Sequence, residues 1–272
     1  MSAVSQIQIP RTLLNRLKIP FPIIRLKGQI VWWEDFESKP ASHVGLSHAG
    51  ATPGYSLYPA GWGMFDNDPT AIFCISRDRG VYGSRSLLCR SSTQALAGTN
   101  GKTDIHRMFF FPPNTNVIGV EFWFWFSNNF YNQQTNQFHL GVVETWDNVN
   151  HIENGFLYEN APTIGIYDTA GNPFVTNKLF SGDSGTWNEG WHHFAYAANL
   201  VSGAIPFAFM DGLDMTASFS GAALRTFADN SFSTFPNKPV RIEFGPINAT
   251  VHNTPADDWR VYYDNIAVSI EG

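Results

Sequence analysis

The carboxylates are the first residues in this chain to test for catalytic chemistry. Hydrolysis of a glycosidic bond uses two carboxyl groups that flank the bond, so both must reach the same site. The densest acidic group contains Glu34, Asp35 and Glu37, but Glu34 and Asp35 would point to opposite faces of an extended strand. The other acids on expected strands each stand alone: Glu121, Glu144 and Glu243. A hydrolytic pair would have to be assembled from scattered residues.

Histidines and nucleophiles give no stronger signal. His192 and His193 are adjacent on an expected strand, so they face opposite ways and cannot both bind one ion. The other histidines lack metal-ligand spacing: His43, His48, His106, His139, His151 and His252. The sequence contains no Gly-x-Ser-x-Gly, phosphate-binding loop or His-Glu-x-x-His. These patterns predict a protein that is not an enzyme.

The composition favours strands over helices as the elements that position these residues. Only 15% of the 272 residues are charged, against about 25% in an average globular protein, while 9 Trp, 9 Tyr and 23 Phe accompany 23 Gly and 16 Pro. Strand patterns bounded by turn residues cover 29–37, 71–77, 84–91, 105–111, 117–126, 137–145, 163–168, 191–199, 206–210, 239–244 and 259–270. Without convincing helices between them, they predict an all-β domain over residues 30–272, made of two packed antiparallel sheets.

Alternation assigns faces to two of these strands. In 117–126, Phe122, Phe124 and Phe126 share one face, which is expected to be core. The other face carries two indoles beside a carboxylate, and it is the expected ligand or partner surface unless a loop covers it: Glu121, Trp123 and Trp125. In 239–244 the apolar residues face one way, while Arg241 and Glu243 face the other.

Residues 1–29 read as an N-terminal arm. The arm has five basic and no acidic residues, whereas the remaining chain has 12 basic and 23 acidic residues. The acidic body disfavours nucleic-acid binding, and no apolar run is long enough to span a membrane. The arm is either a solvated extension or an assembly element that docks on an acidic surface of another copy. Its candidate contact residues are Arg11, Leu14, Leu17 and Arg25.

Two further observations concern the compartment. The arm lacks the apolar core of a secretory signal, so the protein is expected to stay where it is made or to leave inside a virion. Cys74 and Cys89 lie on neighbouring expected strands and could face each other. Two buried thiols without a disulfide are the favoured state in a reducing cytosol.

Four segments together resemble concanavalin A-like and laminin-G-like jelly-roll domains. The first strand carries Asp35-Phe36-Glu37-Ser38, and the second resembles a Gly-x-x-Gly-Ser-x-Ser-Leu signature over 80–87. The Trp-His-His of 191–193 with Asp211-Gly212, and the closing Tyr-Tyr-Asp-Asn of 262–265, complete the set. The resemblance implies a two-sheet jelly-roll sandwich that binds glycans on a concave face in some members.

The same resemblance implies a structural calcium ion that joins the first and last strands. The matching residues are Glu37 and Asp264, and backbone carbonyls and water would complete the six to eight oxygens that calcium takes. The alternative is that both acids make ordinary surface contacts.

The alginate lyases of this fold imply a different pattern, an Arg-x-Glu-x-Arg strand and a Gln-x-His strand. Residues 84–90 contain the arginines without the acid, and Gln137-Phe138-His139 matches the second motif alone.

Three functions follow. The favoured one is a non-enzymatic virion protein, namely a capsid-decoration, tail or fibre component that assembles with itself or other virion subunits through residues 1–29. The first alternative is a carbohydrate-binding module that stacks sugar rings on Trp123 and Trp125, since flat indoles match sugar faces. The second alternative is a glycan hydrolase or lyase of the same fold.

Overall fold

A computed structural model describes most of the expected domain. The described residues are 25–38, 43–46, 54–57, 62–66, 72–81, 83–91, 103–112, 114–126, 138–146, 151–159, 163–167, 173–176, 190–200, 202–219, 225–227, 240–246 and 259–272. Within several of these strands only the backbone is described.

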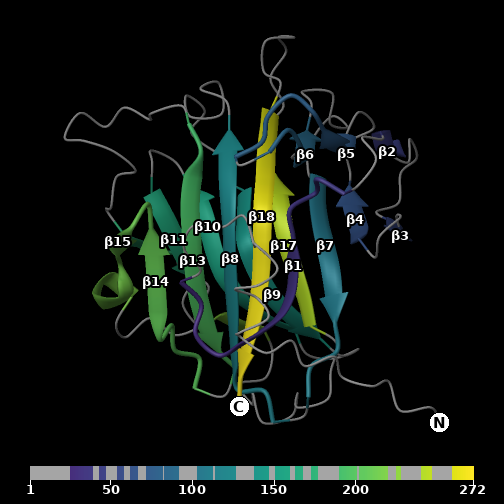
Figure 1. The fold of residues 1–272 in the computed structure, drawn as a ribbon. Coiled ribbons are helices and arrows are strands. Elements are labelled where there is room, and N and C mark those ends of the chain that lie inside the picture. Colours follow the sequence, from purple (N-terminus) through teal and green to yellow (C-terminus); the bar gives the residue numbers. More distant parts are fainter. Residues whose placement is uncertain are drawn as a thin grey trace.

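The strands form two nine-stranded sheets in which every pair is antiparallel (Figure 1). Sheet A follows the order β15 (Leu213–Asp214), β14 (Phe207–Met210), β13 (His192–Asn199), β8 (Val117–Phe126), β18 (Trp259–Glu271), β6 (Ser86–Ser91), β5 (Ile72–Ser76) and β2 (His43–Leu46), and β1 (Gln29–Glu34) also pairs with β18. A short 3-10 helix, η2, covers Thr216–Phe219.

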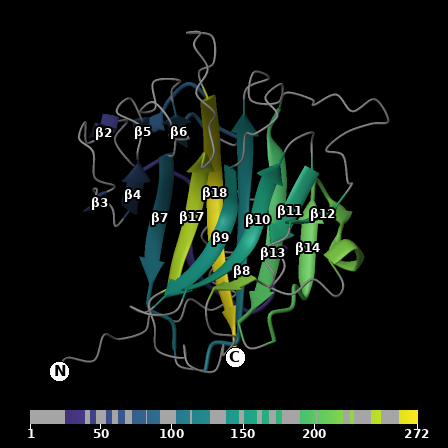
Figure 2. The same ribbon diagram turned by 180° about the vertical axis from the view of Figure 1, so that it is seen from behind.

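Sheet B packs behind sheet A and faces the viewer in Figure 2. Its order is β12 (Pro173–Thr176), β11 (Thr163–Tyr167), β10 (His151–Glu159), β9 (Phe138–Trp146), β17 (Val240–Pro246), β7 (Thr103–Phe109), β4 (Trp62–Asp66) and β3 (Gly54–Leu57), and β16 (Arg225–Phe227) pairs with β10. The two layers confirm the prediction of an all-β jelly-roll sandwich. No helix among the described residues is long and apolar enough to cross a membrane.

The faces of β8 and β17 follow the predicted alternation. Phe122 and Phe124 of β8 are fully buried in the core between the sheets, as are Ile242 and Phe244 of β17. Aromatic edges join the two layers: the rings of Phe122 and Phe244 meet at 5.2 Å and 87°, and Trp32 meets Trp62 at 5.8 Å. The aromatic-rich composition is therefore used to fill the space between the sheets.

A bulge in β9 shapes the centre of sheet B. The register with β17 shifts between Glu243 and Phe244, which leaves Gly141 as an extra residue on β9. Gly141 has a φ of +65°, and a Cβ there would lie 2.9 Å from Val120, so both the backbone and the packing require glycine. The bulge interrupts the regular ladder at two β9 carbonyls.

Two tyrosines of sheet A cross the core to these carbonyls. The Tyr263 hydroxyl donates to the carbonyl of His139 at 3.0 Å and accepts the Gly245 N–H at 2.9 Å. The Tyr196 hydroxyl donates to the carbonyl of Gly141, and burial raises the pKa of Tyr196, so the group keeps its proton. The two hydroxyls thereby link the sheets through hydrogen bonds as well as apolar packing.

The cysteines are both buried and neither forms a disulfide, in agreement with the favoured state. The idea that they could face each other is wrong. Cys74 pairs in register with Leu88, whereas Cys89 pairs with Phe73. Cys89 lies in the core between the sheets, and Cys74 lies in a separate cluster with Trp125 and Tyr262. Because the two side chains occupy opposite faces of sheet A, they cannot bond.

We expect Tyr263→Phe to destabilise the fold by about 2–4 kcal/mol, since it leaves the buried His139 carbonyl and Gly245 N–H without their hydroxyl partner. Tyr196→Phe removes one such bond, so it should cost about 1–3 kcal/mol. Urea unfolding of both variants measures the difference. A Tyr263→Phe change within about 0.5 kcal/mol of the wild type would show that the hydroxyl does not link the sheets.

We expect both thiols to react slowly with Ellman's reagent in the folded protein, because the thiolate is the reactive form. Burial, with a contribution from Asp78, raises the pKa of Cys74 to about 11. Unfolding in guanidinium without a reductant should release both thiols. Recovery of fewer thiols after unfolding would contradict the unbonded state.

Candidate functional site

Four ionisable side chains gather on the face of sheet B that points away from sheet A. Arg241 and Glu243 come from β17, His139 from β9 and His106 from β7, the three neighbouring strands at the centre of the sheet (Figure 2). Register places Glu243 opposite His106 and Gly245 opposite His139. Although they project away from the core, these side chains are only 3–7% exposed. We call them the central cluster.

Glu243 is the centre of this cluster. One carboxylate oxygen pairs with Nε of Arg241, and the other lies 3.3 Å from Nδ1 of His139. Burial strengthens these electrostatic contacts and makes the loss of any one charge expensive. The arrangement therefore holds a guanidinium and an imidazole on two sides of one carboxylate.

A hydrogen bond from the core side fixes the backbone of His139. Its carbonyl accepts the hydroxyl of Tyr263, two residues before the bulge at Gly141. The neighbouring Gly245 N–H donates to the same hydroxyl. Tyr263 thus holds β9 and β17 in register where His139 and Glu243 meet.

Chemically, the cluster can move a proton and bind an anion. A histidine oriented by a carboxylate acts as a general base or acid near neutral pH, and arginine is the preferred partner of carboxylates and other planar anions. The sequence contained parts of this signal, namely the outward Arg241 and Glu243 and the Gln-x-His pattern at His139. It missed His106 and the convergence of the strands.

The predicted ligand face on sheet A has a different environment. Trp125 is 5% exposed, because the guanidinium of Arg79 stacks on its ring at 3.5 Å and Tyr262 packs on its edge. Trp123 is half-buried and stacks on His193 at 4.8 Å. In this conformation Trp125 presents no open ring face, and ligand binding at Glu121, Trp123 and Trp125 stays a prediction.

Glu121 on the same face binds the segment that leads into β1. One oxygen accepts the backbone N–H groups of Arg25 and Leu26 at 2.7 and 3.2 Å, and the other contacts Nε2 of His193 at 2.8 Å. Figure 1 shows this segment crossing in front of β8. Residues 25–28, counted above with the arm, therefore lie against the sheet. Arg11, Leu14 and Leu17 fall outside the described residues, so assembly through the arm stays a prediction.

The paired histidines of the laminin-G-like motif have structural partners. Nδ1 of His192 lies 2.7 Å from Asp211, whose other oxygen accepts the backbone N–H of His193 at 2.8 Å. Asp211 and Gly212 both have positive φ values, as their tight turn requires. The motif therefore serves to join β13 to the turn after β14.

Glu37 and Asp264, the predicted calcium ligands, hold the same turn. Glu37 accepts the backbone N–H groups of Ser84 and Arg85, both at 2.8 Å, and Asp264 accepts those of Val81 and Asn265. Burial raises the pKa of Asp264 to about 7, the two N–H donors oppose the shift, and the nearby Glu37 and Asp35 add to it. Negative charge thus accumulates here.

This charge fits a cation, because each carboxylate oxygen can bind a metal while it accepts an N–H. In the described part of the chain, however, no three side chains of His, Cys, Asp or Glu are arranged to hold a metal ion. Most ligands would have to be backbone and water oxygens, as calcium permits.

Comparison with known proteins gives structural relatives only. No family model matches the sequence, and no curated protein matches it. The endo-β-1,4-glucuronan lyase of the fungus Trichoderma reesei has a similar structure, with a TM-score of 0.50 and 11% identity over 89% of this chain and 96% of that one. The marine alginate lyase of Aplysia kurodai has a TM-score of 0.44 and 10% identity over 73% and 87% of the two chains.

The xylan-binding domain CBM22-2 of Paenibacillus barcinonensis Xyn10C is also similar, with a TM-score of 0.39 and 11% identity over 88% of this chain and 99% of that one. At 11% identity, the likeness to the glucuronan lyase concerns the sandwich fold alone.

These relatives correct two expectations. The sequence favoured a non-enzymatic protein, because its acids and histidines were scattered along the chain. It favoured a virion component because of the basic, apolar arm, the low charge and the absence of a secretory signal pattern. Both parts of that assignment are withdrawn, because the glucuronan lyase has a similar fold and the strands bring the scattered residues together.

Proposed function

We propose that this chain is a polysaccharide lyase that cleaves a uronate-containing polysaccharide at the central cluster. The observation that carries the proposal is the buried contact of Glu243 with both Arg241 and His139 on the outer face of sheet B. The similar structure of a glucuronan lyase supports the choice of fold and chemistry.

Each residue has a role in this proposal. Glu243 accepts the Nδ1 proton of His139, an assignment made from their 3.3 Å contact, and this tautomer leaves the lone pair on Nε2. His139 is then the base. Arg241 pairs with Glu243 through Nε, and its guanidinium is the positive charge of the cluster that would bind the substrate carboxylate.

The reaction is a β-elimination. Nε2 of His139 removes the proton from C5 of the uronate, and the electron pair of that bond forms the C4=C5 double bond. The bond from C4 to the glycosidic oxygen breaks, and the leaving oxygen takes the proton back from the imidazolium. Arg241 stabilises the negative charge that develops on the uronate carboxylate as the C5 proton leaves.

We predict that the purified protein releases unsaturated oligosaccharides from glucuronan or alginate, measured as ultraviolet absorbance of the new double bond. His139→Gln should lower kcat by about 10²–10⁴-fold, the usual contribution of a positioned base. The matched control is His193→Gln on the opposite sheet, which should leave kcat unchanged. Thermal unfolding of both variants checks that they are folded.

Two results would contradict the proposal. New reducing ends without unsaturation would identify a hydrolase. Binding of these polysaccharides without cleavage would identify a carbohydrate-binding domain.

We also propose that calcium stabilises the junction of the first and last strands through Glu37 and Asp264. The nearby carboxylates of Asp35, Glu37 and Asp264 support this proposal, because a cation would offset the unfavourable burial of Asp264. Bound calcium would hold the first and last strands together and would take no part in the reaction.

We predict that a chelator lowers the melting temperature by roughly 5 °C relative to saturating calcium, since a ligand that binds only the folded state stabilises it. Differential scanning calorimetry with calcium, magnesium and EDTA measures the shift. Glu37→Gln should abolish the calcium-dependent part. Identical melting of the wild type under all three conditions would exclude the site.

A further inference from the structure

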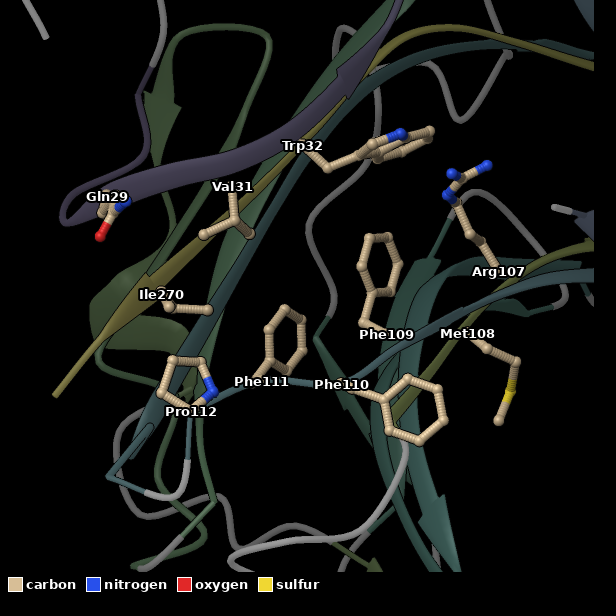
Figure 3. A pocket seen from close by; sticks show the side chains of 10 residues that line it. All are labelled: Gln29, Val31, Trp32, Arg107, Met108, Phe109, Phe110, Phe111, Pro112 and Ile270. Atoms are coloured by element: carbon tan, nitrogen blue, oxygen red, sulfur yellow. The ribbon is translucent and has the colours of Figure 1, made fainter. Parts of the chain in front are cut away.

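A pocket of about 300 Å³ opens at the side of the sandwich between β1 of sheet A and the end of β7 of sheet B (Figure 3). Its wall is mainly aromatic and comes from Trp32 on β1 and from Phe109 and Phe111 at the end of β7. The volume lies at the lower end of the range for small-molecule sites, and it suits a single ring rather than a large ligand.

The aromatic wall is ordered by its own contacts. Trp32 meets Phe109 edge-on at 5.6 Å, and Phe109 stacks on Phe111 at 5.4 Å with the rings 7° from parallel. Figure 3 shows Phe109 and Phe111 directed toward β1, while Phe110 and Met108 project from the other side of the segment. Preordered rings of this kind bind the apolar face of a sugar with little loss of side-chain entropy.

Exposed apolar surface is concentrated at this place. Three large hydrophobic side chains of the described residues are well exposed, namely Phe110, Leu213 and Val31, and Phe110 and Val31 both line the pocket. Phe110 is 80% exposed, an unusual position for a phenylalanine that contacts no ligand. The exposed ring gives a second aromatic surface at the mouth of the pocket.

The wall of the pocket carries a positive charge. Among the described residues that line it, Arg107 is the single charged one, its guanidinium lies 4.7 Å from the ring centre of Trp32, and Glu34 is a nearby carboxylate. Burial lowers the pKa of Arg107, but Glu34 opposes the shift and the guanidinium stays protonated at neutral pH. Arginine binds carboxylates through the planar fork of its N–H groups and also packs on aromatic rings, so one side chain can serve both contacts.

The aromatic wall of the pocket and the central cluster lie on opposite sides of β7, and Met108 borders both. Met108 lines the pocket and pairs in register with Arg241 across β7 and β17. Phe110 follows Met108 on the same side of the chain.

We propose that this pocket is a second binding site for one uronate residue of an acidic polysaccharide. Arg107 binds the carboxylate, the rings of Trp32 and Phe111 contact the sugar face, and Phe110 stacks a neighbouring sugar at the mouth. The choice of uronate rests on the proposed lyase function, whereas the position of the site follows from the pocket itself.

Calorimetric titration of a glucuronate hexasaccharide into the full-length His139→Gln protein tests the site without consuming the ligand. Adding Arg107→Met or Phe110→Ala to this protein should each raise Kd about tenfold, a change of about 1.4 kcal/mol. Leu213→Ala is the matched control, because Leu213 is an exposed apolar residue on β15 outside the pocket, and it should leave Kd unchanged. The neutral hexasaccharide of cellulose should bind at least tenfold more weakly than the glucuronate.

The outcomes separate this inference from the proposed function. Pocket-dependent binding by a wild-type protein that cleaves nothing would uphold the site and refute the lyase. Cleavage together with unchanged Kd values in Arg107→Met and Phe110→Ala would uphold the lyase and refute the site. Equal affinity for the neutral and acidic hexasaccharides would also refute it. If Arg107→Met fails to fold, the exposed Phe110→Ala decides the question.

Discussion

The hydrogen bonds of Tyr263 across the core are the constraint on which the rest of the structure depends. A phenol hydroxyl buried between two sheets must find partners, and the β9 bulge supplies a carbonyl while β17 supplies an N–H. A regular ladder would have left the hydroxyl nothing to bind, so the bulge and the tyrosine require each other. Together they set which side chain of β9 contacts Glu243, and that side chain is His139.

The two outer faces show how environment decides what an acidic residue does. Glu121 accepts two backbone N–H groups and contacts His193, so its carboxylate anchors residues 25 and 26 to the sheet. Glu243 instead contacts two ionisable side chains, one cationic and one able to exchange protons. Backbone N–H groups keep both their position and their proton, so they take no part in proton transfer. The first arrangement is therefore suited to structure and the second to chemistry.

Alternation and turn residues were sufficient to predict the fold class. All eleven predicted strands exist, and β8 was predicted with its observed ends at Val117 and Phe126. The strands that were missed are mostly short ones such as β15, or contain polar residues in the pattern, as in His151–Glu159. Faces were read correctly for β8 and β17 because a period of two is local information.

The central cluster could not be predicted in the same way. It depends on β7, β9 and β17 being neighbours, although they are separated by long stretches of sequence, and on a one-residue bulge that sets the register. A register shift of one residue exchanges the two faces of a strand, so it would have sent His139 into the core. Register also decides the positions of Cys74 and Cys89. That β5 and β6 are neighbours does not show which face of the sheet each cysteine occupies.

A protein of net charge −6 binds a polyanion only if local charge outweighs the overall field. Exposed charges more than about 8 Å apart are largely screened at physiological salt, whereas buried ones are screened much less. Arg241 is buried in the central cluster and Arg107 is half-buried against Trp32, so both act where water weakens them least. In a chain with few charges, the burial of an arginine affects anion binding more than the number of arginines does. The acidic body limits non-specific binding of polyanions, while the two sheltered arginines supply the positive charge of the two proposed uronate sites.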